Sequence, residues 1–328
     1  MPANLTADFL KARKELRAAK DKQAKLAALE KMLATIPKHK GTDHMQADIK
    51  RRIAKLKEDS QGKSTHRRGP QSDHIDREGA GQVVLVGPPN SGKSSLVKTL
   101  TNAHPEVAEY PYSTVTPVPG MMVFEDIKIQ LVDLPPISSE YSESWMYGVA
   151  RQADLCLLVL DGSRNAQELV DSVEEILLIL EQRHIDLVQQ EERTEDDVRV
   201  RELPCRIVLT RGDLGGLEGK AEELSDYFPV IVTSAKDETG LDALRKQVFV
   251  ALKVVRVYTK LPGQPADMKE PYVLPEQSKA IDAVQAVHRD FVDRLKYIRI
   301  WGSGRFDGQQ VPSTHILVDK DIIEIHLN

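Results

Sequence analysis

The sequence predicts an α/β fold built around a mainly parallel sheet, with a smaller part on each side of it. Three observations support this. Between residues 81 and 252, short apolar runs alternate with helical patterns, which is typical of parallel strands covered by helices on both faces. The preceding segment has apolar residues at helical spacing, and the following segment has strand patterns around one amphipathic helix. We therefore expect four parts, at residues 1–60, 61–80, 81–252 and 253–328.

Residues 1–60 are expected to form a basic helical hairpin. Apolar residues at helical spacing predict one long helix over 4–35, which ends before Pro37 because proline disfavours a helical residue before it. A second helix is expected after Gly41, and its apolar face consists of Met45, Ile49, Ile53 and Leu56. Residues 61–80, rich in Gly, Ser, Arg and His, are expected to be a linker.

The charge is unevenly distributed along the chain. Residues 1–70 contain 18 Lys and Arg against 8 Asp and Glu, whereas the whole chain has a formal net charge of −5. A basic segment on an acidic body favours an anionic partner such as RNA, because Lys and Arg neutralise phosphates. A solvated, charged hairpin without a dedicated ligand explains the same charge equally well.

Composition and cysteine usage indicate a globular protein of a reducing compartment. No apolar stretch approaches the roughly 18 residues of a membrane span, and the N-terminus lacks the apolar core of a secretory signal. Cys156 and Cys205 lie in apolar, strand-like runs and are expected to be buried free thiols. We expect a cytoplasmic protein that binds no membrane, and the sequence leaves its oligomeric state open.

The strands and helices of the two later parts follow from short apolar runs and amphipathic patterns. In the central part we expect strands at Val83–Val86, Met121–Phe124, Lys128–Val132, Leu155–Leu160, Arg206–Leu209 and Val230–Thr233. The charged stretch Gln189–Glu202 is expected to be a solvated excursion. In the last part we expect a strand at Val254–Thr259, an amphipathic helix at Ala280–Leu295 and a closing strand at Asp321–Leu327.

A glycine-rich loop joins the first strand to a helix. Residues 87–94 have the pattern G-x-x-x-x-G-K-S in this strand–loop–helix context. Glycines let backbone N–H groups surround phosphate oxygens at the positive end of the helix dipole. Lys93 adds a charge for the β- and γ-phosphates, and the Ser94 hydroxyl is a candidate Mg²⁺ ligand. This predicts a nucleoside triphosphate site made by Gly87, Pro88, Pro89, Asn90, Ser91, Gly92, Lys93, Ser94 and Ser95.

Polar residues that follow three later strands complete the predicted site. Asp133 ends one strand, where a P-loop domain places a carboxylate near Mg²⁺. Asp213 is placed to accept both the N1–H and the N2–H of guanine, a pairing that adenine cannot offer. Backbone amides near Ala235 are placed to meet the guanine O6. The predicted nucleotide-binding residues of this half are Asp133, Thr210, Arg211, Asp213, Ser234, Ala235 and Lys236.

The motifs occur in an order that resembles translation-factor-type GTPases. They are Gly87–Ser94, Thr114, Asp133–Pro136, Thr210–Asp213 and Ser234–Lys236. Residues 110–120 are similar to switch I of Obg-related GTPases, and residues 36–42 with 47–52 resemble the N-terminal region of the developmentally regulated GTP-binding proteins. The tail, from Arg256-Val257-Tyr258-Thr259-Lys260 to 319–325, resembles their TGS domain, a small β-grasp module. The resemblance covers nearly the whole chain.

This resemblance implies a P-loop GTPase domain between the helical hairpin and the TGS domain. It implies GTP, GDP and Mg²⁺ as ligands, with Ser94, Thr114 and Asp133 on the metal side and Thr116 as an alternative to Thr114. The implied function is a slow molecular switch that hydrolyses GTP and acts on ribosomes or RNA through the hairpin and the TGS domain. The alternatives are a nucleotide-gated, protein-binding scaffold with negligible turnover and a small-molecule sensor that uses the tail.

The chain departs from the family pattern in several places. Pro136 stands where glycine usually donates its N–H to the γ-phosphate, and proline has none. Ile137 stands where a glutamine often orients the attacking water, so hydrolysis is expected to be slow. Thr210 and Arg211 replace the usual asparagine and lysine, which leaves use of ATP open although Asp213 remains. The chain also lacks room for the small extra subdomain of longer family members.

Asn90 has two interpretations. In related GTPases, an asparagine at this position helps to hold a K⁺ ion that takes the role of an arginine finger. Turn conformation alone also favours asparagine in such a loop. The candidate catalytic residues are therefore Lys93, Thr114 and Asn90, and K⁺ is a candidate cofactor alongside Mg²⁺.

Overall fold

The computed structural model describes most of the chain from residue 75 onward and part of the N-terminal region. The described ranges are 22–36, 75–101, 118–137, 143–189 and 200–328, together with Asp8, Lys11, Ala12, Glu15, Leu16, Gln46, Ile49, Lys50 and Ile53. Thr114 and Thr116 lie outside the described residues, as does the expected linker before Ile75.

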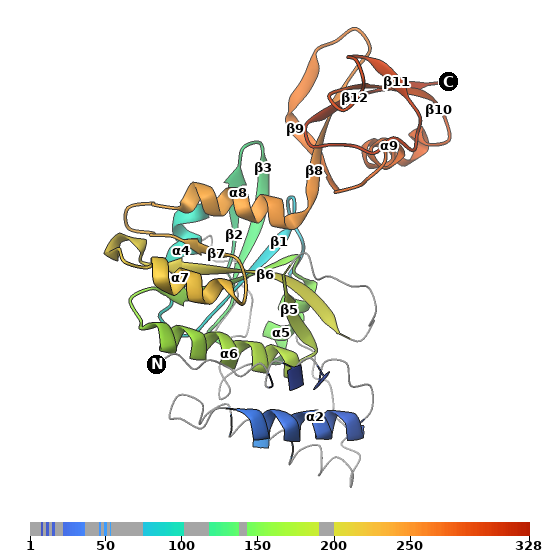
Figure 1. The fold of residues 1–328 in the computed structure, drawn as a ribbon. Coiled ribbons are helices and arrows are strands. Elements are labelled where there is room, and N and C mark those ends of the chain that lie inside the picture. Colours follow the sequence, from blue (N-terminus) through green and yellow to red (C-terminus); the bar gives the residue numbers. More distant parts are fainter. Residues whose placement is uncertain are drawn as a thin grey trace.

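A seven-stranded sheet forms the middle of the molecule (Figure 1). Its strands are β1 Gln82–Val86, β2 Val118–Phe124, β3 Ile127–Asp133, β4 Leu155–Asp161, β5 Ile185–Val188, β6 Arg201–Thr210 and β7 Val230–Val232. The order is β2-β3-β1-β4-β6-β5, and β7 pairs with the second half of β6. All these pairs are parallel except β2 with β3. The predicted mainly parallel sheet is therefore confirmed.

Helices cover both faces of this sheet. On one face lie α4 (Lys93–Thr101) and α8 (Leu241–Leu252); on the other lie α5 (Ser144–Gln152), α6 (Ala166–Gln182) and α7 (Glu218–Ser225). Strands β1 and β4 are buried along their whole length because they have helices on both sides, which explains their continuous runs of Val and Leu. The layers position the loops that follow β1, β3, β6 and β7 at one edge of the sheet.

A second domain follows α8 after one residue, Lys253. Its strands are β8 Val254–Lys260, β9 Ala266–Pro275, β10 Leu295–Trp301, β11 Gln309–Val311 and β12 Asp321–Leu327, in the order β11-β10-β12-β8-β9. Strands β8 and β12 are parallel neighbours, and the other pairs are antiparallel. Helix α9 (Ala280–Val287) packs on one face through residues such as Val284. This arrangement is the expected β-grasp module.

The N-terminal region packs against the central domain, and one expectation about it is wrong. Lys31, on α2 (Lys22–Thr35), places its Nζ 2.6 Å from Glu15 Oε2. One straight helix would separate these residues by about 24 Å, so residues 4–35 are not a single helix. The described helical residues before Leu16 instead lie beside α2. Their buried cluster includes Leu178, which belongs to α6. Figure 1 shows α6 next to α2.

Two further boundaries differ from the expectation. The predicted excursion Gln189–Glu202 ends earlier, because β6 already begins at Arg201, which pairs with β5. The predicted helix Ala280–Leu295 stops at Val287, because His288 is extended with φ −165° and its Nδ1 accepts the N–H of Asp290 at 3.2 Å. Strands β5, β9, β10 and β11 were not predicted.

Both cysteines behave as expected within the sheet. Cys156 and Cys205 are fully buried free thiols on neighbouring strands, β4 and β6. Burial is the main reason why the pKa of the Cys205 thiol lies above its ordinary value. Among the helices that the structure describes, none has the length and apolar character needed to cross a membrane.

Candidate functional site

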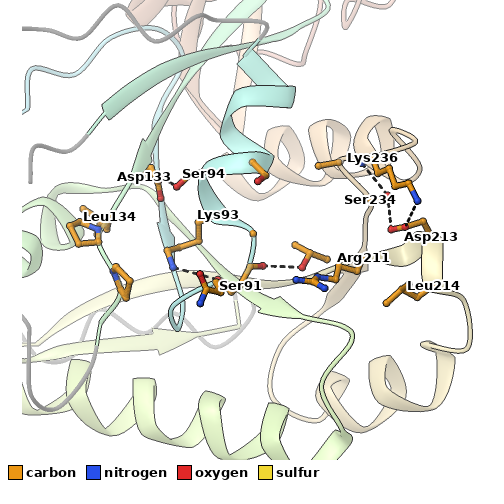
Figure 2. Close-up of a pocket in the computed structure, with 17 residues that line it drawn as sticks. Ser91, Lys93, Ser94, Asp133, Leu134, Arg211, Asp213, Leu214, Ser234 and Lys236 are labelled. Carbon is orange, nitrogen blue, oxygen red and sulfur yellow. Dashed lines mark hydrogen bonds and ion pairs between the residues drawn. The ribbon is translucent and has the colours of Figure 1, made fainter.

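A cleft of about 810 Å³ opens at the carboxyl ends of the parallel strands, where ligands bind in open α/β sheets. Figure 2 shows Lys93, Ser94 and Asp133 at one end of it and Asp213 and Ser234 at the other. The cleft is lined by Asn90, Ser91, Gly92, Lys93, Ser94, Ser95, Asp133, Leu134, Pro135, Pro136, Thr210, Arg211, Asp213, Leu214, Ser234, Ala235 and Lys236. Its size suits a nucleotide-sized ligand.

The glycine-rich loop needs its glycines for packing and for conformation. A Cβ on Gly87 would lie 2.3 Å from the carbonyl oxygen of Val159 on β4, so no larger residue fits there. Gly92 has φ +94° and Asn90 has φ 61°, both in the left-handed region. The turn conformation thus accounts for asparagine at position 90, and Asn90 is also one of the residues that line the cleft. Gly87, Pro88 and Pro89 belong to the loop but do not line the cleft.

Lys93 is buried at the phosphate end of the cleft. Its side chain is 5% exposed, and its Nζ donates to the carbonyl oxygens of Gly87 and Pro88, both at 2.9 Å. Burial lowers the pKa of Lys93 to about 8, and the charge of Asp133 opposes this shift. The ammonium group is thus held inside the loop, where a bound phosphate would be a stronger partner than two carbonyls.

Ser94 and Asp133 form a pair of oxygen donors beside Lys93. The Ser94 hydroxyl donates to Asp133 Oδ2 at 2.5 Å. Burial raises the pKa of Asp133, although Ser94 and Lys93 act in the other direction. The other oxygen, Oδ1, is buried and has no hydrogen-bond partner among the described residues. A hydroxyl and a carboxylate with an unsatisfied oxygen are the hard donors that Mg²⁺ prefers, so these two residues fit such an ion.

The two unusual residues of the base motif have structural partners. Thr210 Oγ1 lies 2.9 Å from the carbonyl oxygen of Ser91 and 3.0 Å from that of Leu160, so its hydroxyl ties β6 to the phosphate loop and to β4. Arg211 is left-handed, with φ 62°, and its Nε lies 3.1 Å from Asp161 Oδ1 at the end of β4. Thr210 therefore connects the two ends of the cleft in this chain.

Asp213 is held in a fixed orientation at the base end. It lies in the short 3₁₀ turn Gly212–Leu214, and its Oδ1 accepts the Ser234 hydroxyl at 3.0 Å. Lys236 Nζ lies 3.6 Å from Oδ2. The Ala235 amide makes no hydrogen bond within the part of the chain that is described, so it is available to a ligand oxygen. Carboxylate and amide together match the edge of guanine.

Four lining residues were not singled out as ligands from the sequence: Leu134, Pro135, Pro136 and Leu214. Leu214 directly follows Asp213, is 59% exposed and contributes an apolar wall to the cleft. Ile137 is 2% exposed and packs in the core, so its side chain does not face the cleft.

The comparisons with known proteins agree with this geometry. A family model described as 50S ribosome-binding GTPase matches residues 82–191, and a TGS domain model matches residues 255–327. Developmentally-regulated G-protein 1 of Arabidopsis thaliana is 30% identical over 92% of this chain and 90% of that protein. Developmentally-regulated GTP-binding protein 1 of Xenopus laevis is 29% identical over 92% of this chain and 98% of that protein.

The alignment with the Arabidopsis relative also shows that this chain is shorter than that protein over the matched region. The alignment with the Arabidopsis protein has 363 positions, while 92% of 328 residues is about 302, so about 61 positions of that relative face no residue here. This agrees with the expected lack of an extra subdomain. A solved GTP-binding protein from Sulfolobus solfataricus in complex with GDP is 21% identical, with a TM-score of 0.40, over 70% of this chain and 65% of that chain.

Proposed function

Because the chain belongs to the family of developmentally regulated GTP-binding proteins, we propose that it is a slow switch that hydrolyses GTP to GDP and acts on ribosomes or RNA. The observation that carries the proposal is a single cleft with a buried lysine at one end and an oriented carboxylate, Asp213, at the other. Such a cleft selects a ligand with phosphates and a guanine edge, which GTP and GDP share.

The residues at the two ends of the cleft have proposed roles. Lys93 exchanges its two carbonyl partners for phosphate oxygens and brings a positive charge to them. Ser94 and Asp133 would hold Mg²⁺, which would neutralise part of the phosphate charge, and Thr114 remains a proposed third residue of this group. Asp213 accepts from the guanine N1–H and N2–H, and the Ala235 amide donates to O6.

Two residues of the segment after β3 support slow turnover. Pro136 lines the cleft but has no N–H to donate to a γ-phosphate. Ile137 is buried in the core and has no polar atom for an attacking water. These residues favour the second candidate function, a nucleotide-gated scaffold for a protein partner with negligible turnover. Single-turnover hydrolysis of GTP, with and without ribosomes, distinguishes a slow enzyme from such a scaffold.

We expect K⁺ to accelerate hydrolysis if the Asn90 side chain helps to hold it. Native protein should then hydrolyse GTP at least about tenfold faster in K⁺ than in Na⁺ at equal ionic strength, which is about 1.4 kcal/mol in the barrier. The variant Asn90→Gly keeps the left-handed loop conformation but removes the amide, so its two rates should be equal. Equal rates for the native protein in both salts would exclude the role.

The basic N-terminal region and the TGS domain are the proposed contacts to the ribosome or to RNA. We expect the full chain to cosediment with ribosomal particles and a chain that lacks residues 1–70 to cosediment several-fold less. Because the contact involves phosphates, raising the salt concentration should weaken it. A chain that stays in the supernatant in the GTP, GDP and nucleotide-free states would refute this part of the proposal.

A further inference from the structure

An arginine of the C-terminal domain is buried against the tip of a hairpin in the central domain. Arg256, on β8, is 2% exposed. Its Nη1 donates to Glu125 Oε2 at 2.6 Å and to Asp126 Oδ1 at 2.7 Å. Its Nε and Nη2 donate to the two oxygens of Asp319 at 3.0 and 2.7 Å, and its guanidinium lies 4.8 Å from the ring centroid of Phe249. The fork with Asp319 leaves Nη1 directed at the hairpin.

Other contacts hold the same hairpin tip to the C-terminal domain. The Tyr258 hydroxyl donates to Asp126, and Lys320 Nζ lies 3.0 Å from Glu125 Oε2. The hydrogen bond from Arg256, followed by that from Lys320, keeps the pKa of Glu125 below its usual value. We call these six residues the clamp: Glu125, Asp126, Arg256, Tyr258, Asp319 and Lys320. Only one residue separates α8 from β8, so the clamp is a second fixed connection between the domains.

The hairpin joins the clamp to the nucleotide cleft. Glu125 and Asp126 form the two-residue turn between β2 and β3, whose register runs from Phe124 opposite Ile127 to Val118 opposite Asp133. At about 3.4 Å per residue, seven residues place the two ends about 20 Å apart. The clamp therefore holds one end of β3, and Asp133, in contact with Ser94, stands at the other. Figure 1 shows β3 reaching toward β8.

We propose that Arg256 is a positioning residue for the nucleotide site, through which the C-terminal domain regulates how strongly Mg²⁺ supports nucleotide binding. The proposal rests on the proposed GTP site. Asp133 is hydrogen-bonded to Ser94 here, and a cation that takes both oxygens as ligands replaces that hydrogen bond. The Asp133 carboxylate at this end of β3 would thus exchange one partner for another when the cation binds, and β3 is anchored at its other end by the clamp. Coupling of this kind is reciprocal between the two ends.

The test compares two arginines of the same domain in the full-length chain. Arg256→Met removes the clamp charge, whereas Arg299→Met removes an exposed arginine of β10 that makes no contact with the hairpin among the described residues. For each protein, the Kd for GDP is measured with excess Mg²⁺ and with a chelator, and the ratio of the two is compared. We expect Arg256→Met to change this ratio at least about fivefold and Arg299→Met to leave it at the native value.

A second variant and a second kind of measurement complete the test. Asp126→Asn weakens the clamp but leaves the fork of Arg256 with Asp319, so it serves if Arg256→Met fails to fold, as judged by circular dichroism. Hydrogen exchange of β8 and β12 in the native protein should change when Mg²⁺ and GDP are added. An unchanged ratio in a folded clamp variant overturns the proposal while leaving the nucleotide site intact. Absence of guanine nucleotide binding by the native chain overturns both.

Discussion

Replacing Asp213 with asparagine is expected to lower the affinity for GTP by about 100-fold or more and to abolish its preference over ATP. The carboxylate is the group that accepts two guanine hydrogens, and each hydrogen bond to a charged group contributes about 1.5–3 kcal/mol. An asparagine offers one oxygen and an NH₂ group, which repels the guanine N–H donors. Rotation of the amide does not remove this conflict, because only one of its two terminal atoms accepts whereas both carboxylate oxygens of Asp213 do.

Three measurements on this variant separate base recognition from folding. Titration with GTP, ATP and xanthosine triphosphate should show a loss for GTP and a gain for xanthosine triphosphate, which has a carbonyl at C2 that accepts from the new NH₂ group. Asp226→Asn, at an exposed residue after α7, should bind GTP like the native chain. If the native chain binds GTP and ATP equally, the guanine assignment is wrong.

The position of the glycine-rich loop at one end of the cleft was predictable because its sequence pattern is local. The residues from Gly87 to Ser94 follow one another, and the conformations that surround a phosphate depend on glycine at fixed positions in that run. Asp213 and Ser234 were also predictable, because each follows a strand in the central part and parallel strands end at the same edge of a sheet. The TGS resemblance led in the same way to the β-grasp module.

What could not be predicted depends on contacts between distant residues. Thr210 contacts Ser91 across 119 positions, and nothing in either run indicates that this hydroxyl links the two loops. Apolar spacing carried the predicted helix through His288 because Phe291 and Val292, in and after the short 3₁₀ turn Arg289–Phe291, pack against the same core as the helix. Similarly, the ion pair of Lys31 with Glu15 and the burial of Ala12 against α2 are what reveal that residues 4–35 are not one helix.

Replacing Lys93 with methionine is expected to lower the affinity for GTP by about 30-fold to several thousand-fold. Removing one partner of a hydrogen-bonded, buried charge pair costs about 2–5 kcal/mol, and 1.4 kcal/mol is tenfold in Kd. Methionine has nearly the same length, so the loop keeps its packing. Lys98→Met, at an exposed lysine on the same helix, is the matched control and should leave the Kd unchanged within about twofold. Fluorescence titration with a labelled nucleotide measures both.

The pH dependence distinguishes lost charge from lost structure in this variant. Because the pKa of Lys93 falls from 10.5 to about 8 on folding, the nucleotide-free native state binds fewer protons than the unfolded chain between these values. Its free energy of unfolding therefore rises over that interval, and below pH 8 burial of the charge costs about 3 kcal/mol. Native GTP affinity should instead weaken as pH rises from 7 to 9, since only protonated Lys93 attracts phosphate.

Lys93→Met should show neither effect, and its melting temperature at pH 7, without nucleotide, should equal or exceed the native one. A variant that melts lower and binds weakly at every pH would mean that Lys93 supports the fold of the loop rather than the phosphate.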